Sequence, residues 1–170
     1  MTKEEFIYGA GNWDNHRFLL WPALEETEGT IIEMGMGNGS TRFLRKYAIN
    51  NNRHLFSYEN NLEWFEKFPL EHSDFHEMIY LSDWDLVSNN IANPDVVFID
   101  HAPGERRKID IVRFADKAKV IVCHDTEPAA DHGYQMRAEL AKFKYQIDYQ
   151  SPGAWASAVS NFIDVTKFQV

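Results

Sequence analysis

Three closely spaced glycines point to a ligand-binding loop in the first quarter of the chain. Glycine tolerates positive φ angles and lets a ligand approach the backbone closely. Where such a loop leads into a helix, the free N–H groups of the first turn attract a phosphate or a carboxylate. The loop is the run Glu33-Met34-Gly35-Met36-Gly37-Asn38-Gly39-Ser40.

An acidic residue further along the chain completes this candidate site. Glu59 lies 20 positions after Gly39, and a carboxylate at a strand end can accept two hydrogen bonds from a ribose diol. The glycines depart from the dinucleotide pattern G-x-G-x-x-G, because the third comes one residue early and Ser40 stands in its place. The spacing therefore favours a nucleoside ligand other than NAD.

Side chains able to move a proton follow the two most apolar runs. Asp100 and His101 come after the run at 95–99, and His124 and Asp125 come after 119–123. A histidine with its ordinary pKa of about 6.5 suits proton transfer near neutral pH, and a carboxylate can orient its ring. We predict Asp100, His124 and Asp125 as the catalytic residues, with His101 as a second candidate base.

These residues need a scaffold that gathers strand ends, and the sequence pattern predicts one. Apolar runs alternate with helical spacing, which indicates an α/β fold: a doubly wound, mostly parallel seven-stranded sheet with helices on both faces. Ligands of such sheets bind at the carboxyl ends of the strands. Strands are predicted at 30–34, 54–58, 77–81, 95–100, 119–123, 144–149 and 156–165, and helices at 15–26, 40–49, 62–68, 83–91, 105–115 and 133–143.

Length, charge and composition define the class of protein. The 170 residues suit one domain, with a lead-in at 1–28, a core at 30–165 and a flap expected at 12–17. Seventeen basic and 26 acidic residues give a net charge of −9, which predicts no nucleic-acid partner. One cysteine, a polar start and no apolar run near the roughly 20 residues of a membrane span favour a cytoplasmic protein without a membrane partner. A homo-oligomer stays open.

The motifs, in this order, resemble those of the class I S-adenosylmethionine-dependent methyltransferases, closest to the small-molecule O-methyltransferases. Their first motif, an acidic residue with G-x-G-x-G and then Ser or Thr, matches residues 33–41. Further matches are Glu59, the run 82–84, the fourth-strand motif 98–101 and the fifth-strand motif 120–126. The resemblance implies a Rossmann-like fold and S-adenosyl-L-methionine as cofactor, held by Glu33, Gly35, Met36, Gly37, Asn38, Ser40, Thr41, Glu59, Asn60, Asp83, Trp84 and Asp100.

The resemblance implies methyl transfer to a small-molecule acceptor, with oxygen as the expected atom. A hydroxyl acceptor must lose its proton to a base or to a metal-bound group. Catechol-type relatives carry Asp-Asn after the fifth strand, whereas this chain has Asp125-Thr126. A divalent metal is therefore possible but not favoured, and no residue is assigned as a ligand. The oxygen- and nitrogen-rich candidates for such a site are Asp100, Asp125, Glu127, Asp131 and His132.

Two other interpretations stay open. One is an NAD-type oxidoreductase, and the other is a non-catalytic module that binds the cofactor. Arg106 and Arg107 also have two interpretations: an arginine fork for a substrate carboxylate or phosphate, or solvated side chains bonded to Glu105 or Asp110.

Overall fold

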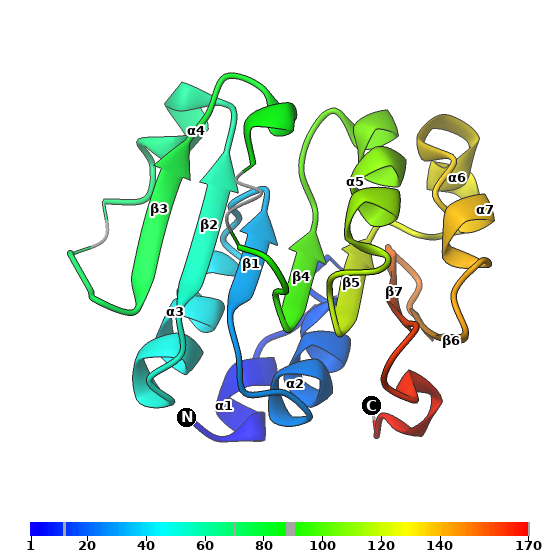
Figure 1. The fold of residues 1–170 in the computed structure, drawn as a ribbon, viewed down its shortest axis with the longest axis horizontal. Coiled ribbons are helices and arrows are strands. Elements are labelled where there is room, and N and C mark those ends of the chain that lie inside the picture. The colour runs from blue at the N-terminus through cyan, green and yellow to red at the C-terminus, as the bar shows by residue number, and fades with distance from the viewer. Residues whose placement is uncertain (12, 70, 88–90, 170) are drawn as a thin grey trace.

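A computed structural model describes residues 1–11, 13–69, 71–87 and 91–169 (Figure 1). These residues form one sheet in the order β3-β2-β1-β4-β5-β7-β6. The first five strands of that order are parallel, and β7 runs antiparallel to both β5 and β6. The predicted seven-stranded α/β fold is confirmed as a mixed sheet. Its strands are β1 (Ile31–Met34), β2 (Leu55–Glu59), β3 (His76–Tyr80), β4 (Val96–Ile99), β5 (Val120–His124), β6 (Tyr145–Gln150) and β7 (Trp155–Ser160).

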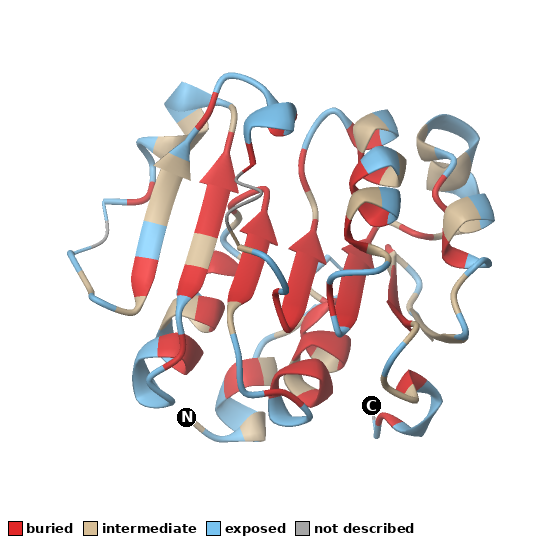
Figure 2. Ribbon diagram, viewed as in Figure 1, coloured by how far each residue is buried: buried red, intermediate tan, exposed pale blue. Residues whose placement is uncertain are grey.

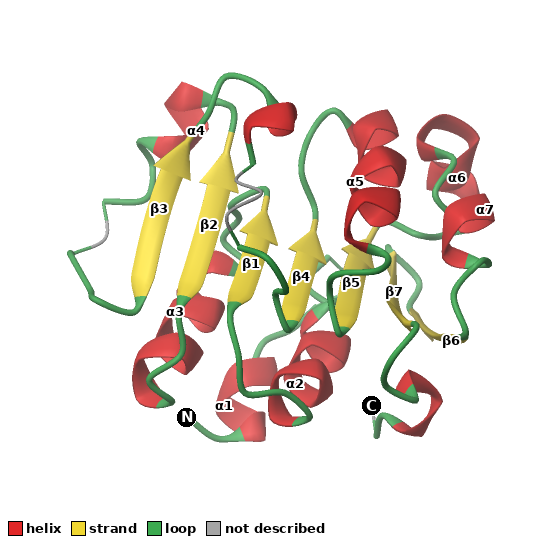
Figure 3. Ribbon diagram, in the orientation of Figure 1, coloured by secondary structure: helices red, strands yellow, loops and turns green. Residues whose placement is uncertain are grey.

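Helices cover both faces of the sheet (Figure 3). On one face pack α1 (Lys3–Ile7), α2 (Arg17–Glu25) and α3 (Thr41–Asn50). On the other pack α5 (Arg107–Phe114) and α7 (Arg137–Leu140). The remaining elements are α4 (Leu62–Phe65), α6 (Pro128–Tyr134) and the 3-10 helices η1 (Trp84–Leu86), η2 (Gly104–Arg106) and η3 (Val165–Lys167).

The central strands explain why their sequences are continuously apolar. Every residue of β1, β4 and β5 is buried (Figure 2), as expected for parallel strands with helices on both faces. Side chains alternate between the faces, so Ile31 joins the core under α2 and α3 while Ile32 joins the core under α5. Glu33 consequently faces α3.

Two predicted helices differ in the structure. The helix expected at 133–143 is divided: α6 ends at Tyr134, Gln135 adopts a left-handed conformation with φ 55°, and α7 begins at Arg137. The Asp131 carboxylate accepts a hydrogen bond from the Arg137 N–H, a local cap that hydrophobic spacing does not reveal. The helix expected at 83–91 is reduced to η1, and residues 88–90 lie outside the described residues. None of the described helices could cross a membrane.

Candidate active site

The glycine loop follows β1 and leads into α3, as the sequence predicted. Gly35 has φ +94°, and a Cβ there would meet the His101 backbone at 2.6 Å, where the chain after β4 passes. Both the positive φ and the close approach require glycine. At Gly37 a Cβ would meet only the Ser40 hydroxyl, at an ordinary 3.5 Å. Of these two glycines, Gly35 is therefore the one that the loop requires; at Gly39 a Cβ would meet the Asp14 carboxylate, a flexible side chain.

Glu33 ties the loop together from beneath. Its Oε1 accepts hydrogen bonds from Ser40 Oγ at 2.6 Å and from Thr41 Oγ1 at 3.0 Å. Thr41 Oγ1 in turn accepts the Gly37 N–H at 2.9 Å. Burial raises the pKa of Glu33 to about 7, against the lowering effect of its hydroxyl donors, which include Ser57. The carboxylate thus positions the loop rather than facing a ligand.

Glu59 closes the other side of the loop. Its Oε2 accepts the Met36 N–H at 3.1 Å, and its Oε1 accepts the N–H groups of Asn60 and Asn61 at 2.9 and 2.8 Å. Each carboxylate oxygen has two lone pairs, so Oε1 is fully used and Oε2 retains one. The arrangement leaves Glu59 able to accept one further hydrogen bond, where the sequence analysis expected two.

A cleft of about 730 Å³ opens where these groups meet. One wall contains Trp64, whose Nε1 donates to the Met36 carbonyl at 2.6 Å. Trp64 was not among the predicted site residues, and only its position after a strand end could have indicated it. The cleft is lined by Gly35, Met36, Gly37, Glu59, Asn60, Asn61, Trp64, Asp100, His101, Ala102 and Pro103.

Six of the predicted cofactor-binding residues do not line this cleft. Glu33, Ser40 and Thr41 lie buried beneath the loop, and Asn38 is exposed on it. The other two lie behind the opposite wall. Asp83 is exposed and accepts the Asp85 N–H at the start of η1, and Trp84 is buried against His101, with ring centroids 4.3 Å apart. Burial and local capping explain all six positions, since the strand-end rule locates a residue but not its side chain.

Asp100 and His124 form the centre of a second group at the strand ends. Register pairs Ile99 with Cys123, so the next residues of β4 and β5 are neighbours. His124 Nδ1 lies 3.3 Å from Asp100 Oδ1 and 3.4 Å from Asp125 Oδ1. Asp125 has a positive φ of 55°, a conformation that Asp tolerates better than most residues. The structure brings all three predicted catalytic residues together.

Arg107 holds this group from α5. Its guanidinium lies 3.2 Å from Asp100 Oδ1 and 3.0 Å from Asp125 Oδ2. It also donates to the backbone carbonyls of His101 and His124, at 2.7 and 3.1 Å. Arg107 is 5% exposed, so it is part of the buried site and not a free anion-binding fork. Arg106 matches the other interpretation, because it pairs with Asp110.

The charges around His124 set its proton affinity. Burial acts to lower the pKa of His124, but the hydrogen bond and charge of Asp100, with the charge of Asp125, outweigh it and raise the pKa above the ordinary value. Burial acts to raise the pKa of Asp100, but His124 and Arg107 reverse this and lower it. The pair therefore consists of an ionised carboxylate and a histidine of enhanced basicity. His124 Nε2 has no hydrogen-bond partner among the described residues.

The lead-in contributes His16, which the sequence analysis placed only within the flap. Its ring packs on Phe98, with centroids 4.7 Å apart, and edge-on to His124 at 4.8 Å. Burial first, and then the charge of His124, lower the pKa of His16 to about 3. His16 Nε2 lies 3.4 Å from the Gly39 carbonyl, so the lead-in packs against the glycine loop. None of residues 13–17 is among those that line the cleft, and the flap stays a prediction. Asn12 of that flap lies outside the described residues.

The second candidate base, His101, faces away from the chemistry. Its Nε2 bonds to Asp110 Oδ2 at 2.9 Å, and its ring stacks on Trp84. Only its backbone region reaches the Gly35 turn. Burial lowers the pKa of His101 despite its bond to Asp110, whereas the pKa of His124 is raised, so His101 is the weaker of the two candidate bases.

The residues suggested for a metal site do not converge. Among the described residues, the metal-type donors that cluster are His16, Asp100 and His124, with one ligand atom from each within 4.8 Å of the others. The Asp100 carboxylate already accepts from the Arg107 cation and from His124. A second cation would be repelled by Arg107. These side chains fit proton transfer better than metal ligation.

Comparison with known proteins shows the fold. No known family profile and no curated protein sequence matches the chain, but solved structures do. The N-terminal domain of human METTL16 in complex with SAH has a TM-score of 0.59 at 15% identity, over 88% of this chain and 70% of that one. The hMettl16 catalytic domain with MAT2A 3'UTR hairpin 6 has 0.60 at 13%, over 89% and 71%. Spermidine synthase with the transition-state analogue AdoDATO has 0.67 at 16%, over 93% and 62%.

At such identities the likeness is one of fold. It confirms the predicted Rossmann-like fold, and one of these structures of the same fold was solved in complex with SAH. The prediction that excluded a nucleic-acid partner is wrong, because a catalytic domain of this fold was solved with a hairpin of an untranslated region. Net charge is a sum over the whole surface, whereas binding depends on the local field. Arg42, Arg45 and Lys46, which line one surface hollow, illustrate this difference.

Proposed function

We propose that the protein is an S-adenosylmethionine-dependent methyltransferase that acts on a hydroxyl oxygen of a small-molecule acceptor. The observation that carries the proposal is that Asp100 lines the cleft and also contacts His124. A cofactor cleft is thereby joined directly to a base and its orienting carboxylate. The cofactor, when bound, supplies an activated methyl group on a sulfonium sulfur.

The cleft residues suit that cofactor in two respects. Gly35 lets the loop backbone lie against the chain that follows β4, so both segments line the same cleft, and the α3 amide groups behind the loop favour a carboxylate. Glu59 Oε2 keeps one lone pair for a ribose hydroxyl. Trp64 and Pro103 supply apolar surface on the cleft walls. Together they offer polar and apolar contacts of the kind that fix the orientation of a small ligand.

His124 is proposed to remove the acceptor's proton. If Nδ1–H donates to Asp100, the Nε2 lone pair is the one free to receive a proton. Asp100 then stabilises the imidazolium that forms, as an orienting carboxylate does in hydrolase triads. Arg107 keeps Asp100 ionised and bonds to the backbone at both strand ends, so the pair keeps its geometry. Alignment of nucleophile and methyl group supplies up to about 7–11 kcal/mol of the barrier reduction.

Methyl transfer from labelled cofactor tests the proposal. The acceptor panel contains small alcohols, phenols, amines and an RNA hairpin, and calorimetry compares S-adenosylhomocysteine with NAD. Transfer to a small hydroxyl compound, lost in His124→Ala but with binding of S-adenosylhomocysteine retained, is the expected result. Tight binding of NAD alone would favour the oxidoreductase. Cofactor binding without transfer across the panel would favour the non-catalytic module.

A second measurement tests the ribose contact. Glu59→Gln keeps the side-chain volume but replaces one carboxylate oxygen by an NH2 group, which can donate a hydrogen bond but cannot accept one. We expect a loss of S-adenosylhomocysteine affinity of about 10-fold, corresponding to one charge-assisted hydrogen bond. Glu63→Gln, which makes the same change at an exposed carboxylate of α4 that does not line the cleft, is the matched control. Unchanged affinity in Glu59→Gln would show that Glu59 serves only the loop.

A further inference from the structure

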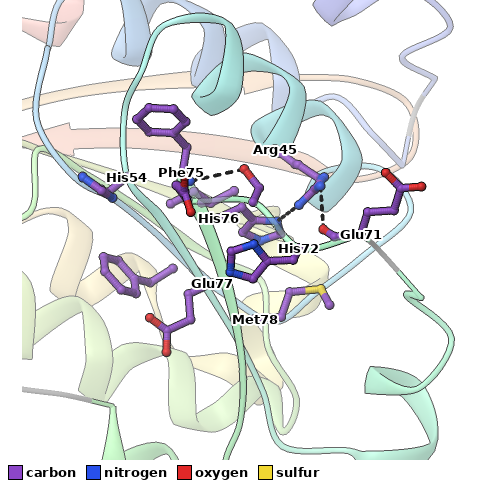
Figure 4. A pocket seen from close by; sticks show the side chains of 12 residues that line it. Arg45, His54, Glu71, His72, Phe75, His76, Glu77 and Met78 are labelled. Atoms are coloured by element: carbon purple, nitrogen blue, oxygen red, sulfur yellow. Dashed lines mark hydrogen bonds between the residues drawn. The ribbon is translucent and has the colours of Figure 1, made fainter.

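A second cavity, of about 590 Å³, lies at the opposite end of β2 and β3 from the cofactor cleft (Figure 4). Its walls contain three histidines, and two of them, His54 and His72, are exposed. The third, His76, is 7% exposed. It is also the only one of the three with side-chain hydrogen bonds recorded among the described residues. Those bonds lead from the cavity into the protein interior.

His76 belongs to a continuous series of hydrogen bonds that ends at the glycine loop between β1 and α3, called the cofactor loop below. Arg45 Nη1 lies 3.2 Å from His76 Nδ1, and His76 Nε2 lies 2.9 Å from Ser57 Oγ. Ser57 Oγ donates to Glu33 Oε2 at 2.5 Å. The chain thus crosses from β3 through β2 to β1, because Ser57 is the register neighbour of Glu33. The other oxygen of Glu33 holds Ser40 and Thr41.

The direction of each hydrogen bond follows from its donors. A guanidinium can only donate, so His76 Nδ1 must accept from Arg45 and the proton of the neutral ring is on Nε2. That proton is donated to Ser57 Oγ, and the Ser57 proton is donated to Glu33. Burial first, and then Arg45, lower the pKa of His76 to about 4, so the ring is neutral near pH 7. This series of hydrogen bonds runs from the Arg45 cation to the Glu33 carboxylate, and every hydrogen bond in it donates toward Glu33.

Opposing influences act on the Glu33 carboxylate. Burial and the charge of Asp100 at the end of β4 disfavour its ionised form, while the hydroxyl groups of Ser40, Thr41 and Ser57 favour it. The Arg45 charge acts on it only through His76 and Ser57. Aligned hydrogen bonds polarise one another in a medium of low dielectric constant, so removal of His76 weakens the donation by Ser57.

We infer that His76 is a positioning residue for the cofactor loop, which keeps Glu33 ionised through Ser57. The consequence for binding rests on the proposed function. An ionised Glu33 accepts from Ser40 and Thr41, whereas a protonated one must use an oxygen as a donor and loses acceptor capacity. Protonation of Glu33 therefore loosens the loop, and loss of His76 makes protonation occur at higher pH.

The test begins with the protein free of cofactor. Infrared difference spectra follow the carboxyl band of Glu33 against pH, and Glu33→Gln identifies that band. We expect His76→Leu and Ser57→Ala each to move the midpoint upward by about one pH unit, the effect of one hydrogen bond of roughly 1.4 kcal/mol. The matched control is His72→Leu, which removes a histidine from the same cavity wall and should leave the midpoint unchanged.

Affinity for S-adenosylhomocysteine is then measured against pH for the same variants. The midpoint of the pH dependence of this affinity should move with the midpoint of the infrared titration. The affinity on the alkaline plateau should stay that of the unmodified protein. His76→Gln should return both midpoints toward their original values, because its amide can accept from Arg45 and donate to Ser57.

Two results would overturn the inference. The first is that the Glu33 carboxyl band titrates with the same midpoint in His76→Leu and Ser57→Ala as in the control His72→Leu. The other is a loss of affinity that is the same at every pH, which would indicate a structural role alone. Should His76→Leu fail to fold, Ser57→Ala decides. Failure of every variant to bind S-adenosylhomocysteine would reject the proposed function, while the infrared titration would still report on Glu33.

Discussion

Two clusters of side chains on the same sheet each contain a carboxylate, a histidine and an arginine. The order in which these three residues contact one another differs between the clusters. Under the cofactor loop, Arg45 contacts His76, and a serine separates His76 from Glu33. At the ends of β4 and β5, Arg107 contacts Asp100, and Asp100 contacts His124 directly. The three kinds of side chain are the same in both groups, but the order of contacts differs, and a second carboxylate, Asp125, lies beside His124.

The order of contacts decides which group carries a proton. Burial together with Arg45 lowers the pKa of His76 to about 4, whereas Asp100 and Asp125 overcome burial and raise the pKa of His124. Burial raises the pKa of Glu33 to about 7, whereas contact with His124 and Arg107 lowers that of Asp100. The first group therefore suits positioning, and the second suits exchange of a proton with an acceptor.

The largest effect should come from removing the proposed base. We expect His124→Ala to lower the rate of methyl transfer to a hydroxyl acceptor by about 10²–10⁴-fold, the usual contribution of general-base catalysis. Single-turnover rates with labelled cofactor measure it. The control, His132→Ala, changes an exposed histidine on α6 and should leave the rate unaltered. A His124→Ala rate close to that of the control would remove the functional contrast between the two groups.

Next in size is the loss of the Arg107 cation. Arg107→Met leaves Asp100 and Asp125 without their buried partner, and we expect the free energy of unfolding in urea to fall by about 3 kcal/mol. Arg106→Met should cost about 1 kcal/mol or less, because Asp110 keeps His101 and Arg113 as partners. Equal losses in the two variants would show that the buried position of Arg107 confers no special stability.

The glycine loop offers a smaller, local test. Gly35→Ala combines a positive φ with a Cβ only 2.6 Å from the His101 backbone, and such strain costs about 1–3 kcal/mol. S-adenosylhomocysteine affinity should fall by about 10-fold or more. Gly37→Ala adds a Cβ in ordinary contact with Ser40 and should bind nearly as the unmodified protein does. The reverse ranking would mean that Gly37 approaches the ligand more closely than Gly35.

The last comparison concerns the sign of the pH dependence of stability, which should differ between the two histidines. The folded-state pKa of His124 is raised, so the stability it contributes is complete below about pH 6.5 and is lost as pH rises through the folded value. The folded-state pKa of His76 is lowered to about 4. The folded protein therefore loses stability as pH falls from about 6.5 toward 4, by up to about 1.4 kcal/mol per pH unit.

Urea unfolding at pH 5 and pH 8 compares the two. His124→Gln should cost more stability at pH 5 than at pH 8, and His76→Leu should cost less at pH 5 than at pH 8. The same pH trend in both variants would contradict the contrast drawn from their contacts.

Several features could be predicted because they depend on residues close together in the sequence. The apolar runs of β1, β4 and β5 gave the buried strands, and the positions of Gly35, Glu59 and Asp100 followed from the strand ends. The pairing of Asp100 with His124 also follows from neighbouring parallel strands. The division of the helix predicted at 133–143 is also local, but hydrophobic spacing does not reveal the side-chain cap between Asp131 and Arg137 on which it depends.

The sequence by itself determined the α/β fold and the strand ends that carry Gly35, Glu59 and Asp100, because hydrophobic periodicity and glycine conformations are local properties of the chain. The strand predicted at 156–165, by contrast, ends at Ser160. The tertiary structure alone decided how those side chains point. Glu33 turns beneath the loop toward Ser57, His101 turns to Asp110, and His16 joins His124 from the lead-in. A buried polar group takes the orientation that satisfies its hydrogen bonds, and its partners come from elements distant in the sequence.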